Sequence, residues 1–538
     1  MCGILAIIGK GKDQDLVKKL SKRMAHRGPD ESDLQVTDKG HILSHERLSI
    51  IDLHSGKQPI QGTSTAYMVH NGEIYNHQPL REGILKNHSF RTKSDSEVIV
   101  HLYEELGTDF CHLLDGDWAF VVVDGDEYMA GRDPMGVKPL YYGLDERGRM
   151  YFASEMKPIA DQCKTFSTFP PGHYYTPKTG FVKYYAPAYE DYTQATHDLD
   201  LEAIRNSLTQ ATRKRLMSDV PIGVLLSGGL DSSLTSAIAS RLLKEQGKTL
   251  HSFSIGLDEH APDAAAARKV ADFLGTEHHE IHFTINQGIE ILDKLIWHLE
   301  TYDVTSIRAS TPMYFLSKAI TDMGIKVVLS GEGADEIFGG YLYFRNAPSV
   351  EDFQKETIER VQKLFTADLL RADKSTMAHG LEARVPFLDK AFLDLAMQIK
   401  PEEKMPKTYD GKEKYILRKA FDTPDNPYLP AEVLWRQKEQ FSDGVGYNWI
   451  DQLIGHCSSK VSDAQLEGAA AEFPYNTPTT KEAYFYRTIF NTYFPQVSAA
   501  QTVRKWIPKW QENQDPSGRA NAAHVQADVE ISKTVQEI

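Results

Sequence analysis

One short stretch, Leu226-Ser227-Gly228-Gly229-Leu230-Asp231-Ser232-Ser233, constrains the fold of this chain more than any other. The apolar run 221–226 that leads into it predicts a buried strand, and the apolar residues of 234–243 recur at helical spacing. Two glycines between a strand and a helix let the backbone turn sharply, so that its N–H groups converge at the positive end of the helix dipole. The stretch therefore predicts a phosphate-binding turn. Asp231 suggests a bridging Mg²⁺, because a carboxylate repels a bare phosphate.

This turn differs from other glycine-rich loops. It is neither Gly-x-x-x-x-Gly-Lys-Ser/Thr nor Gly-x-Gly-x-x-Gly, so it predicts neither a γ-phosphate loop nor a dinucleotide loop. It resembles the pyrophosphate-binding loop of the ATP pyrophosphatases, which cleave ATP between the α and β phosphates and leave AMP on a carboxylate or carbonyl oxygen. A plain strand-to-helix turn is the alternative for the two glycines alone.

Length, charge and cysteine content exclude several classes of protein. The 538 residues suffice for two or three domains, and 60 basic against 75 acidic side chains argue against a general nucleic-acid or anionic-membrane binder. No apolar run is long enough to span a bilayer, and the apolar residues 2–9 predict a buried strand rather than an export signal. The four cysteines form no metal-ligand motif. We therefore expect a soluble protein of the reducing cytoplasm without structural zinc.

A potential nucleophile stands at the second position. If Met1 is removed, Cys2 carries both a thiol and a free α-amine, and an amine with a reference pKa of about 7.7 to 8.0 can accept the thiol proton near neutral pH. A cysteine at this position is by itself most often a small buried hydrophobe. The interpretation changes because four motifs follow it in order, at 26–30, 45–52, 67–76 and 93–97.

Each of these motifs has an ordinary alternative when it is taken alone. His-Arg-Gly-Pro-Asp at 26–30 could be a basic helix end followed by a turn, and Asn71-Gly72 most often marks a hairpin turn. Glu73 and Asp95 could be solvated charges, although residues 93–97 also form an N-cap signal for a helix over 98–106.

Together the motifs resemble the class II glutamine amidotransferases, which are N-terminal nucleophile hydrolases with an α-β-β-α sandwich fold. The resemblance runs from Cys2 to about Tyr185. It implies that Cys2 attacks the side-chain amide of glutamine and that Asn71, with the Gly72 N–H, forms the oxyanion hole. Arg47 would clamp the substrate carboxylate, and Asp95 its amine. The glutamine-binding residues implied are Arg47, Leu48, Ser49, Ile50, Ile51, Asn71, Gly72, Glu73 and Asp95.

The second half of the chain alternates between strand and helix patterns. The segments 170–175 and 190–198 are interpreted as the exit from the first domain. A helix is expected at 201–216. The strands expected after the phosphate turn are 249–257, 278–283 and 326–329, and the helices are 264–273, 288–298 and 311–320. This order predicts a parallel sheet covered on both faces, with its ligands at the carboxyl ends of the strands.

A second signature follows the last of these strands. Ser330-Gly331-Glu332-Gly333-Ala334-Asp335-Glu336 places three acids among small residues, which suits chemistry better than a core, although an exposed acidic turn is the alternative. With 338–341 it resembles the asparagine synthetases. The match continues through 307–312, 380–389, 412–418 and 435–444, so that nearly the whole chain to about Pro508 resembles the glutamine-hydrolysing members of bacterial and plant type.

The resemblance implies a reaction and its residues. ATP, with Mg²⁺, would adenylate the side chain of aspartate, and ammonia released at Cys2 would attack the β-aspartyl-AMP. Glu332 would guide the activation, and Lys414 would neutralise charge on the phosphoryl group, although a helix-surface lysine is the alternative. Arg308 or Arg384 would bind the α-carboxylate of aspartate, and the sequence does not separate them. The ATP-binding residues implied are Leu225, Ser227, Gly228, Gly229, Asp231, Ser232, Ile255, Ser330 and Gly331, and the metal ligands are Asp231 and Asp335.

These patterns predict an α+β N-terminal nucleophile hydrolase domain over 1–190. An α/β parallel-sheet ATP pyrophosphatase domain with additional C-terminal helices follows over 200–510, and a polar tail over 511–538 is expected to be disordered. The resemblance implies small-molecule substrates, no nucleic-acid or membrane partner, and a homodimer.

Two other functions remain possible. One is a related ligase, such as a β-lactam synthetase or a peptide-amidating enzyme. A lactam-closing enzyme needs no ammonia, so the intact set Cys2, Arg47, Asn71 and Asp95 disfavours it. The other is an inactive homologue that binds nucleotide and glutamine without turnover. The complete set of acids and hydroxyls argues against that alternative.

Overall fold

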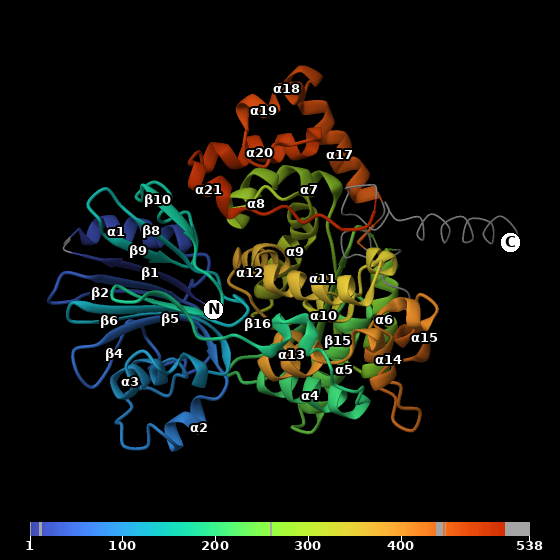
Figure 1. Ribbon diagram of the computed structural model, residues 1–538, viewed down its shortest axis with the longest axis horizontal. Helices are drawn as coiled ribbons and strands as arrows, with labels where there is room; N and C mark the ends of the chain where they lie inside the picture. Colours follow the sequence, from blue (N-terminus) through green and yellow to red (C-terminus); the bar gives the residue numbers. More distant parts are fainter. Residues whose placement is uncertain (1, 10–12, 259–260, 437–444, 447, 512–538) are drawn as a thin grey trace, which may run out of the picture.

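The chain folds into two parts that lie side by side. The computed structural model describes residues 2–9, 13–258, 261–436, 445–446 and 448–511. Two stacked sheets make up the first part, and a sheet surrounded by helices makes up the second, with the C-terminal helices above it (Figure 1). Residues 512–538 of the predicted tail and most of the 435–444 motif lie outside the described residues. Within the described residues, no helix has the length and apolar character needed to cross a bilayer.

The first part contains two six-stranded antiparallel sheets, ordered β10-β8-β9-β1-β3-β2 and β12-β11-β7-β6-β5-β4. The strands of the first sheet are β1 (Gly3–Ile8), β2 (Glu31–Val36), β3 (Ile42–Arg47), β8 (Tyr141–Leu144), β9 (Met150–Ala153) and β10 (Thr165–Thr168). Those of the second are β4 (Ile60–Gln61), β5 (Tyr67–Ile74), β6 (Gly116–Asp124), β7 (Glu127–Arg132), β11 (His173–Thr176) and β12 (Gly180–Lys183). The helices are α1 (Gln14–Ser21), α2 (His77–Glu82) and α3 (Glu97–Leu106).

Strand β1 shows why these layers form. Successive side chains of a strand point to opposite faces of its sheet. Leu5 and Ile7 belong to the buried cluster that contains the apolar face of α1, whereas Ile4 and Ala6 belong to the cluster that contains Val121 of the second sheet. Both faces of β1 are therefore buried, and the predicted α-β-β-α sandwich is confirmed.

In the first part the structure rules out one local alternative and corrects one local prediction. Strand β5 runs through Asn71-Gly72, where the two residues pair with Ala119 and Trp118 of β6, so this pair is not a hairpin turn. Gly72 has a φ of +139°, and a Cβ there would lie 2.0 Å from the carbonyl oxygen of Asp117. The segment 170–175, predicted as part of the exit, contains the start of β11, which pairs with both β7 and β12.

The second part is built on a five-stranded parallel sheet ordered β15-β14-β13-β16-β17, which confirms the predicted α/β architecture. Its strands are β13 (Ile222–Leu225), β14 (His251–Gly256), β15 (Glu277–His282), β16 (Val327–Leu329) and β17 (Glu382–Arg384). The helices up to the sheet's end are α4 (Leu201–Lys214), α5 (Leu230–Lys244), α6 (Pro262–Leu274), α7 (Ile285–Glu290), α8 (Leu292–Leu299), α9 (Val304–Asp322), α10 (Ala334–Phe338), α11 (Val350–Lys363) and α12 (Asp368–Met377). Those that follow are α13 (Lys390–Met397), α14 (Tyr415–Ala420), α15 (Ala431–Leu434), α17 (Asn448–Lys460), α18 (Asp463–Glu467), α19 (Ala469–Glu472), α20 (Lys481–Tyr493) and α21 (Val497–Thr502).

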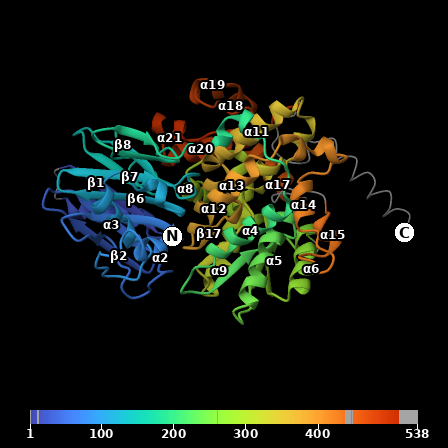
Figure 2. The ribbon, with the colours of Figure 1, turned by 60° about the horizontal axis from the view of Figure 1, so that its bottom comes forward.

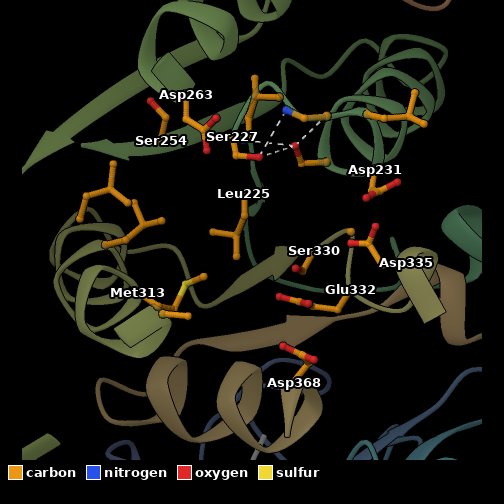
Figure 3. A pocket seen from close by; sticks show the side chains of 18 of the residues that line it. Leu225, Ser227, Asp231, Ser254, Asp263, Met313, Ser330, Glu332, Asp335 and Asp368 are labelled. Atoms are coloured by element: carbon orange, nitrogen blue, oxygen red, sulfur yellow. Dashed lines mark hydrogen bonds between the residues drawn. The ribbon is translucent and has the colours of Figure 1, made fainter. Parts of the chain in front are cut away.

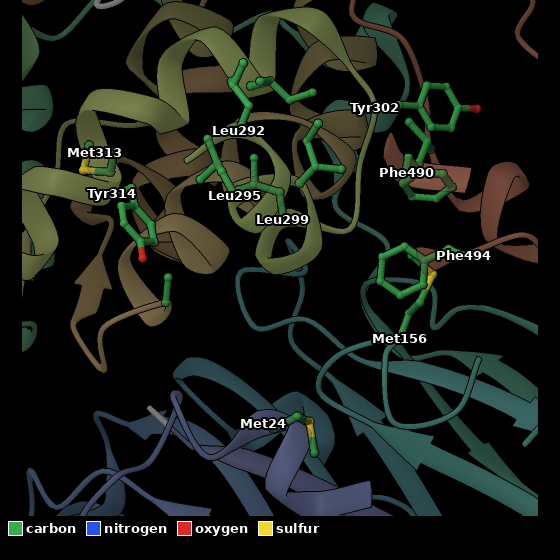
Figure 4. Packing of buried hydrophobic residues seen from close by; sticks show 14 of the residues in the cluster. Met24, Met156, Leu292, Leu295, Leu299, Tyr302, Met313, Tyr314, Phe490 and Phe494 are labelled. Carbon is green, nitrogen blue, oxygen red and sulfur yellow. The ribbon is translucent and has the colours of Figure 1, made fainter. Parts of the chain in front are cut away.

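The two parts share apolar packing. One buried cluster contains Met24 and Met156 of the first part together with Leu292, Leu299 and Phe494 of the second. Figure 4 shows Met156 next to Phe494, the residue directly after α20. Helix α12 lies on the side of the second part that faces the first in both ribbon views (Figures 1 and 2). Residues of the two halves can therefore contribute to each other's sites.

Two candidate active sites

Cys2 lies in the first candidate site, directly before β1. Its backbone nitrogen, which becomes the α-amine if Met1 is removed, donates a hydrogen bond to Asn71 Oδ1 at 2.7 Å. Its carbonyl oxygen accepts a hydrogen bond from Arg27 Nε at 3.0 Å. Burial raises the pKa of the Cys2 thiol, so the thiol needs a nearby base to become a nucleophile. The structure thus brings the predicted nucleophile and the predicted oxyanion residue together.

The amide of Asn71 has a defined orientation. Because its oxygen accepts from Cys2, its nitrogen is the donor that remains. Asn71 Nδ2 is buried and has no hydrogen-bond partner within the described residues. A buried, unsatisfied donor beside a nucleophile is suited to stabilising the negative charge that develops on a substrate oxygen.

Two buried carboxylates lie near this strand. Asp95 Oδ2 accepts a hydrogen bond from the backbone nitrogen of Ile74 at 2.7 Å, and burial raises the pKa of Asp95 to about 6. Burial, together with the charges of Asp95 and Glu382, raises the pKa of Glu73 well above its usual value. An ammonium group placed here would stabilise both ionised acids, which fits the predicted contact with the amine of glutamine.

The segment 47–51 packs against the second half of the chain. Arg47 donates to Glu31 Oε2 and to the Asp52 carbonyl oxygen, each at 2.6 Å. The predicted glutamine-binding residues Leu48 and Ile50 belong to one buried cluster with Val327 of β16 and Met377 of α12, and Ile51 packs on that cluster. Ser49 donates its backbone N–H to Asp30 Oδ2 at 2.7 Å. The first site therefore rests directly on the second domain.

The second candidate site is a pocket at the carboxyl ends of β13, β14 and β16 (Figure 3). Its lining includes the predicted residues Leu225, Ser227, Gly229, Asp231, Ser232, Ile255, Ser330, Gly331, Glu332, Asp335 and Lys414. Gly228 does not line it. Gly228 has a φ of +73°, and a Cβ there would lie 2.4 Å from Ala266 Cβ, so this glycine turns the chain against α6. The sequence therefore predicted most of this pocket.

The turn before α5 is organised by its hydroxyl groups. Ser227 and Ser232 have their Oγ atoms 3.0 Å apart, and Ser232 Oγ donates to the carbonyl oxygen of Gly229 at 3.2 Å. Figure 3 draws hydrogen bonds of this turn as dashed lines around Ser227. Because α5 begins at Leu230, the hydroxyls lie at the positive end of a 15-residue helix, where a phosphate group is stabilised.

Lys414 joins the two signature loops. Its ammonium lies 2.5 Å from Asp231 Oδ2 and 2.6 Å from Asp335 Oδ1, and its side chain is only 1% exposed. Lys414 has a φ of 53°, a left-handed backbone conformation that is rare for lysine and that concentrates at functional sites. A Cβ on Gly340 would lie 2.0 Å from Asp335 Oδ1, so a glycine is needed there. The surface-lysine alternative is wrong, because this side chain is buried in the pocket.

The oxygen atoms of Asp231 and Asp335 fit a hard divalent cation. Mg²⁺ prefers carboxylate and phosphate oxygens. Asp231 Oδ1 is buried and accepts no hydrogen bond from the described residues. The two carboxylates share one lysine, which balances one of their two negative charges. The donor set is therefore compatible with the predicted metal.

Neither arginine that the sequence proposed for aspartate lines this pocket. Arg308 is paired with Glu482 through two hydrogen bonds of 2.9 and 2.6 Å. Arg384 is fully buried, donates to Glu382 Oε1 at 2.6 Å and lies 3.4 Å from Glu73 Oε1 of the first site. Both arginines are paired with buried carboxylates outside the pocket. Arg384 lies at the boundary between the two domains.

Sequence reasoning missed an arginine of this pocket that contacts a predicted catalytic residue. Arg371 lines the pocket, and its Nη2 donates to Glu332 Oε1 at 2.9 Å and to Asp368 Oδ1 at 3.0 Å. Both Arg371 and Asp368 belong to α12, a segment that carries none of the quoted motifs. No local signal in the sequence pointed to this helix.

Comparison with known proteins agrees with this two-site architecture. The family model described as glutamine amidotransferase domain matches residues 1–182, and the model described as asparagine synthase matches residues 203–358 and 346–514. A probable glutamine-hydrolysing asparagine synthetase of Dictyostelium discoideum is 51% identical and covers 98% of this chain and 99% of its own. Relatives of that name from Arabidopsis thaliana and Asparagus officinalis are each 50% identical over 97% of this chain and over 93% and 92% of their own lengths. The chain therefore belongs to the family of glutamine-hydrolysing asparagine synthetases.

Proposed function

We propose that this protein converts aspartate to asparagine, using ATP to activate the side-chain carboxylate and glutamine to supply the nitrogen. The products are asparagine, AMP, pyrophosphate and glutamate. One arrangement supports the proposal. The chain holds a buried cysteine at position 2 whose backbone nitrogen donates to Asn71 and, in the second domain, a pocket with two carboxylates around Lys414.

In the first site, the α-amine of Cys2 accepts the thiol proton, and the thiolate attacks the side-chain amide carbon of glutamine. Asn71 Nδ2 and the Gly72 N–H stabilise the oxygen that becomes negative. Glu73 and Asp95 bind the substrate ammonium, and Arg47 binds its carboxylate. The breakdown of the tetrahedral intermediate releases ammonia and leaves a thioester, which water then hydrolyses to glutamate.

In the second site, the turn formed by Ser227, Gly229 and Ser232 holds the β and γ phosphates of ATP, and Leu225 and Ile255 line the nucleoside side. Mg²⁺ bound by Asp231 and Asp335 would neutralise phosphate charge. Lys414 stabilises the charge on the α-phosphoryl group during attack by the aspartate side chain. Glu332 orients that carboxylate together with Arg371, whose Nη2 donates to Glu332 Oε1. Arg371 also offers a cation in the pocket to an acidic substrate.

Ammonia then attacks the β-aspartyl carbonyl and AMP leaves. Ammonia is mostly protonated at pH 7, and the protonated form is not a nucleophile. We therefore expect ammonia to move inside the protein, and the shared packing of the two domains supports this expectation.

The test is a product balance. The protein with its N-terminal cysteine exposed is supplied with ATP, Mg²⁺, aspartate and amide-labelled glutamine, and AMP, pyrophosphate, glutamate and labelled asparagine are quantified. We expect AMP and asparagine in equal amounts, with the label in asparagine. AMP without glutamate would instead indicate an intramolecular ligase, and the absence of all four products would indicate an inactive homologue.

Three finer statements belong to the same proposal. We assign the glutaminase domain to 1–190 and the synthetase domain to 200–510, boundaries supported by the end of β12 at Lys183 and the start of α4 at Leu201. We expect a cytoplasmic protein, since its four cysteines are free and buried. We expect a homodimer from the family resemblance.

A further inference from the structure

A fully buried arginine connects the nucleophile of the first site to the second domain. We propose that Arg27 and Asp373 position Cys2 for attack on glutamine, so that glutamine hydrolysis depends on helix α12 of the synthetase domain. This inference rests on the proposed function and names positioning residues for it. Neither side chain touches the reacting atoms of the substrate, and both act through the backbone of Cys2.

Three nitrogens of Arg27 make hydrogen bonds. Nε donates to the carbonyl oxygen of Cys2 at 3.0 Å, and Nη1 donates to Glu155 Oε1 at 3.0 Å. Nη1 and Nη2 donate to the two carboxylate oxygens of Asp373 at 2.8 and 3.2 Å. The Arg27 and Asp373 side chains are 0% and 4% exposed. The bidentate contact fixes the plane of the guanidinium, and with it the direction of the bond to Cys2.

The neighbouring backbone holds Arg27 in place. A Cβ on Gly28 would lie 2.1 Å from the carbonyl oxygen of Glu46, so the His-Arg-Gly-Pro-Asp turn packs directly on β3. This close packing fixes the position of the turn relative to β3. The contact of Arg27 with the second domain is the one with Asp373. A shift of Asp373 would move the guanidinium and the carbonyl of the nucleophilic residue together.

Helix α12 reaches both sites within its ten residues, a length of about 15 Å at 1.5 Å per residue. Arg371 contacts Glu332 in the nucleotide pocket, Asp373 contacts Arg27, and Met377 belongs to the buried cluster of Leu48 beside Cys2. A helix moves as a unit over such a length. A ligand that displaces Glu332 from Arg371 therefore acts on the same element that holds Arg27.

A purely structural role is the alternative, because Asp373 also belongs to a buried charge network at the domain boundary. Lys374, the next residue, contacts Glu300 and donates to the hydroxyl of Tyr141 at 2.8 Å. Removing one partner of a buried ion pair destabilises proteins in general. The test must therefore separate lost stability from lost nucleophile placement.

The decisive variant is Asp373→Asn, which keeps the size of the side chain and removes its charge. Misplacement of a reacting group by about 1 Å can lower a rate by roughly 10²-fold. We expect kcat for glutamate release to fall by at least tenfold, KM for glutamine to stay within twofold, and asparagine synthesis from added ammonium to stay within twofold. The same split is expected for Arg27→Lys, which cannot form the bidentate contact.

Glu356→Gln is the matched control. Glu356 is likewise fully buried and accepts hydrogen bonds from Arg360 Nε at 2.6 Å and from the Tyr343 hydroxyl at 2.7 Å, within the second domain and away from Cys2. It should lower the melting temperature about as much as Asp373→Asn without changing the ratio of glutamine-dependent to ammonium-dependent synthesis. Equal loss of both activities in the two variants would overturn the proposal, and so would an unchanged glutaminase kcat in Asp373→Asn.

The link to the second site has its own readout. Glutamate release is measured with and without ATP plus aspartate, and the ratio between the two rates should move towards one in Asp373→Asn. If Asp373→Asn keeps the wild-type ratio of the two glutamate-release rates, the claim that helix α12 links the two sites is contradicted. Failure of the proposed function has a different signature. The wild-type protein would then make no asparagine even from ammonium, while the effect of Asp373→Asn on glutamate release would remain measurable.

Discussion

Lys404 offers a quantitative test of the structure away from both sites. Its side chain is buried, and its ammonium donates only to the carbonyl oxygen of Ala396, at 3.3 Å, among the contacts of the described residues. Burial lowers the pKa of Lys404 to about 7, from a usual value near 10.5. Each unit of pKa shift corresponds to about 1.4 kcal/mol. At pH 7 and below, keeping this lysine buried therefore costs roughly 5 kcal/mol, an upper value for a group whose surroundings can relax.

The sign of the pH dependence follows from linkage. Because the folded-state pKa lies below the unfolded one, folding releases a proton between about pH 7 and 10.5, and the penalty shrinks as pH rises through that window. The substitution Lys404→Met approximately keeps the length of the side chain and removes its charge. It should raise stability by roughly 5 kcal/mol at pH 7 but only about 2 kcal/mol at pH 9.

Thermal and urea unfolding at pH 6, 7, 8 and 9 measure this effect, with Lys400→Met as the control. The Lys400 side chain is 48% exposed and its partner is Asp198, so its replacement should change stability by less than about 1 kcal/mol at every pH. A stability difference between Lys404→Met and wild type that stays constant from pH 7 to 9, or a less stable variant at pH 7, would refute the reasoning.

Three further predictions concern the chemistry. Cys2→Ala should abolish glutamine-dependent synthesis and keep synthesis from ammonium, and residual glutaminase activity in that variant would contradict the assignment of the nucleophile. Asp231→Asn and Asp335→Asn should each suppress pyrophosphate release at ordinary Mg²⁺, because a neutral ligand binds the cation more weakly, and higher Mg²⁺ should restore part of the rate. Glu332→Gln should lower adenylation by at least ~10²-fold with either nitrogen source while basal glutamate release persists. Normal pyrophosphate release with failed amide formation would instead make Glu332 a base for ammonia.

Much of the fold could be read from local patterns. The strand, glycine turn and helix around Ser227 to Ser232 were predicted in the right order. Strand β13 ends at Leu225, and α5 begins at Leu230, four residues before the helical pattern expected at 234–243. Boundaries were less accurate where a helix cap was not recognised. Helix α9 begins at Val304, seven residues before the expected start, because Asp303 caps it by accepting from the Ser306 N–H and because Pro312 is accommodated inside it.

Among the residues of the two sites, some positions could be predicted from the sequence and others could not. Side chains adjacent to a signature turn, such as Asp231 and Glu332, were placed correctly because the end of a strand fixes where the next few residues lie. Arg384, one of the two arginines that the sequence offered for the aspartate carboxylate, does not line the nucleotide pocket. It belongs to a signature, yet its strand, β17, is the edge of the sheet, and its guanidinium lies beside Glu73 instead of in the nucleotide pocket.

The sequence by itself determined the elements, their order and the chemistry of the two loops, since periodicity, glycine conformation and helix capping act over a few residues. Only the tertiary structure decided which charged groups meet. Arg27 and Asp373 are 346 positions apart, and Arg371 and Glu332 are 39 apart. Such pairs form because packing two apolar cores together brings buried charges within reach, and a buried charge must find a partner wherever the fold supplies one. No local pattern records that choice.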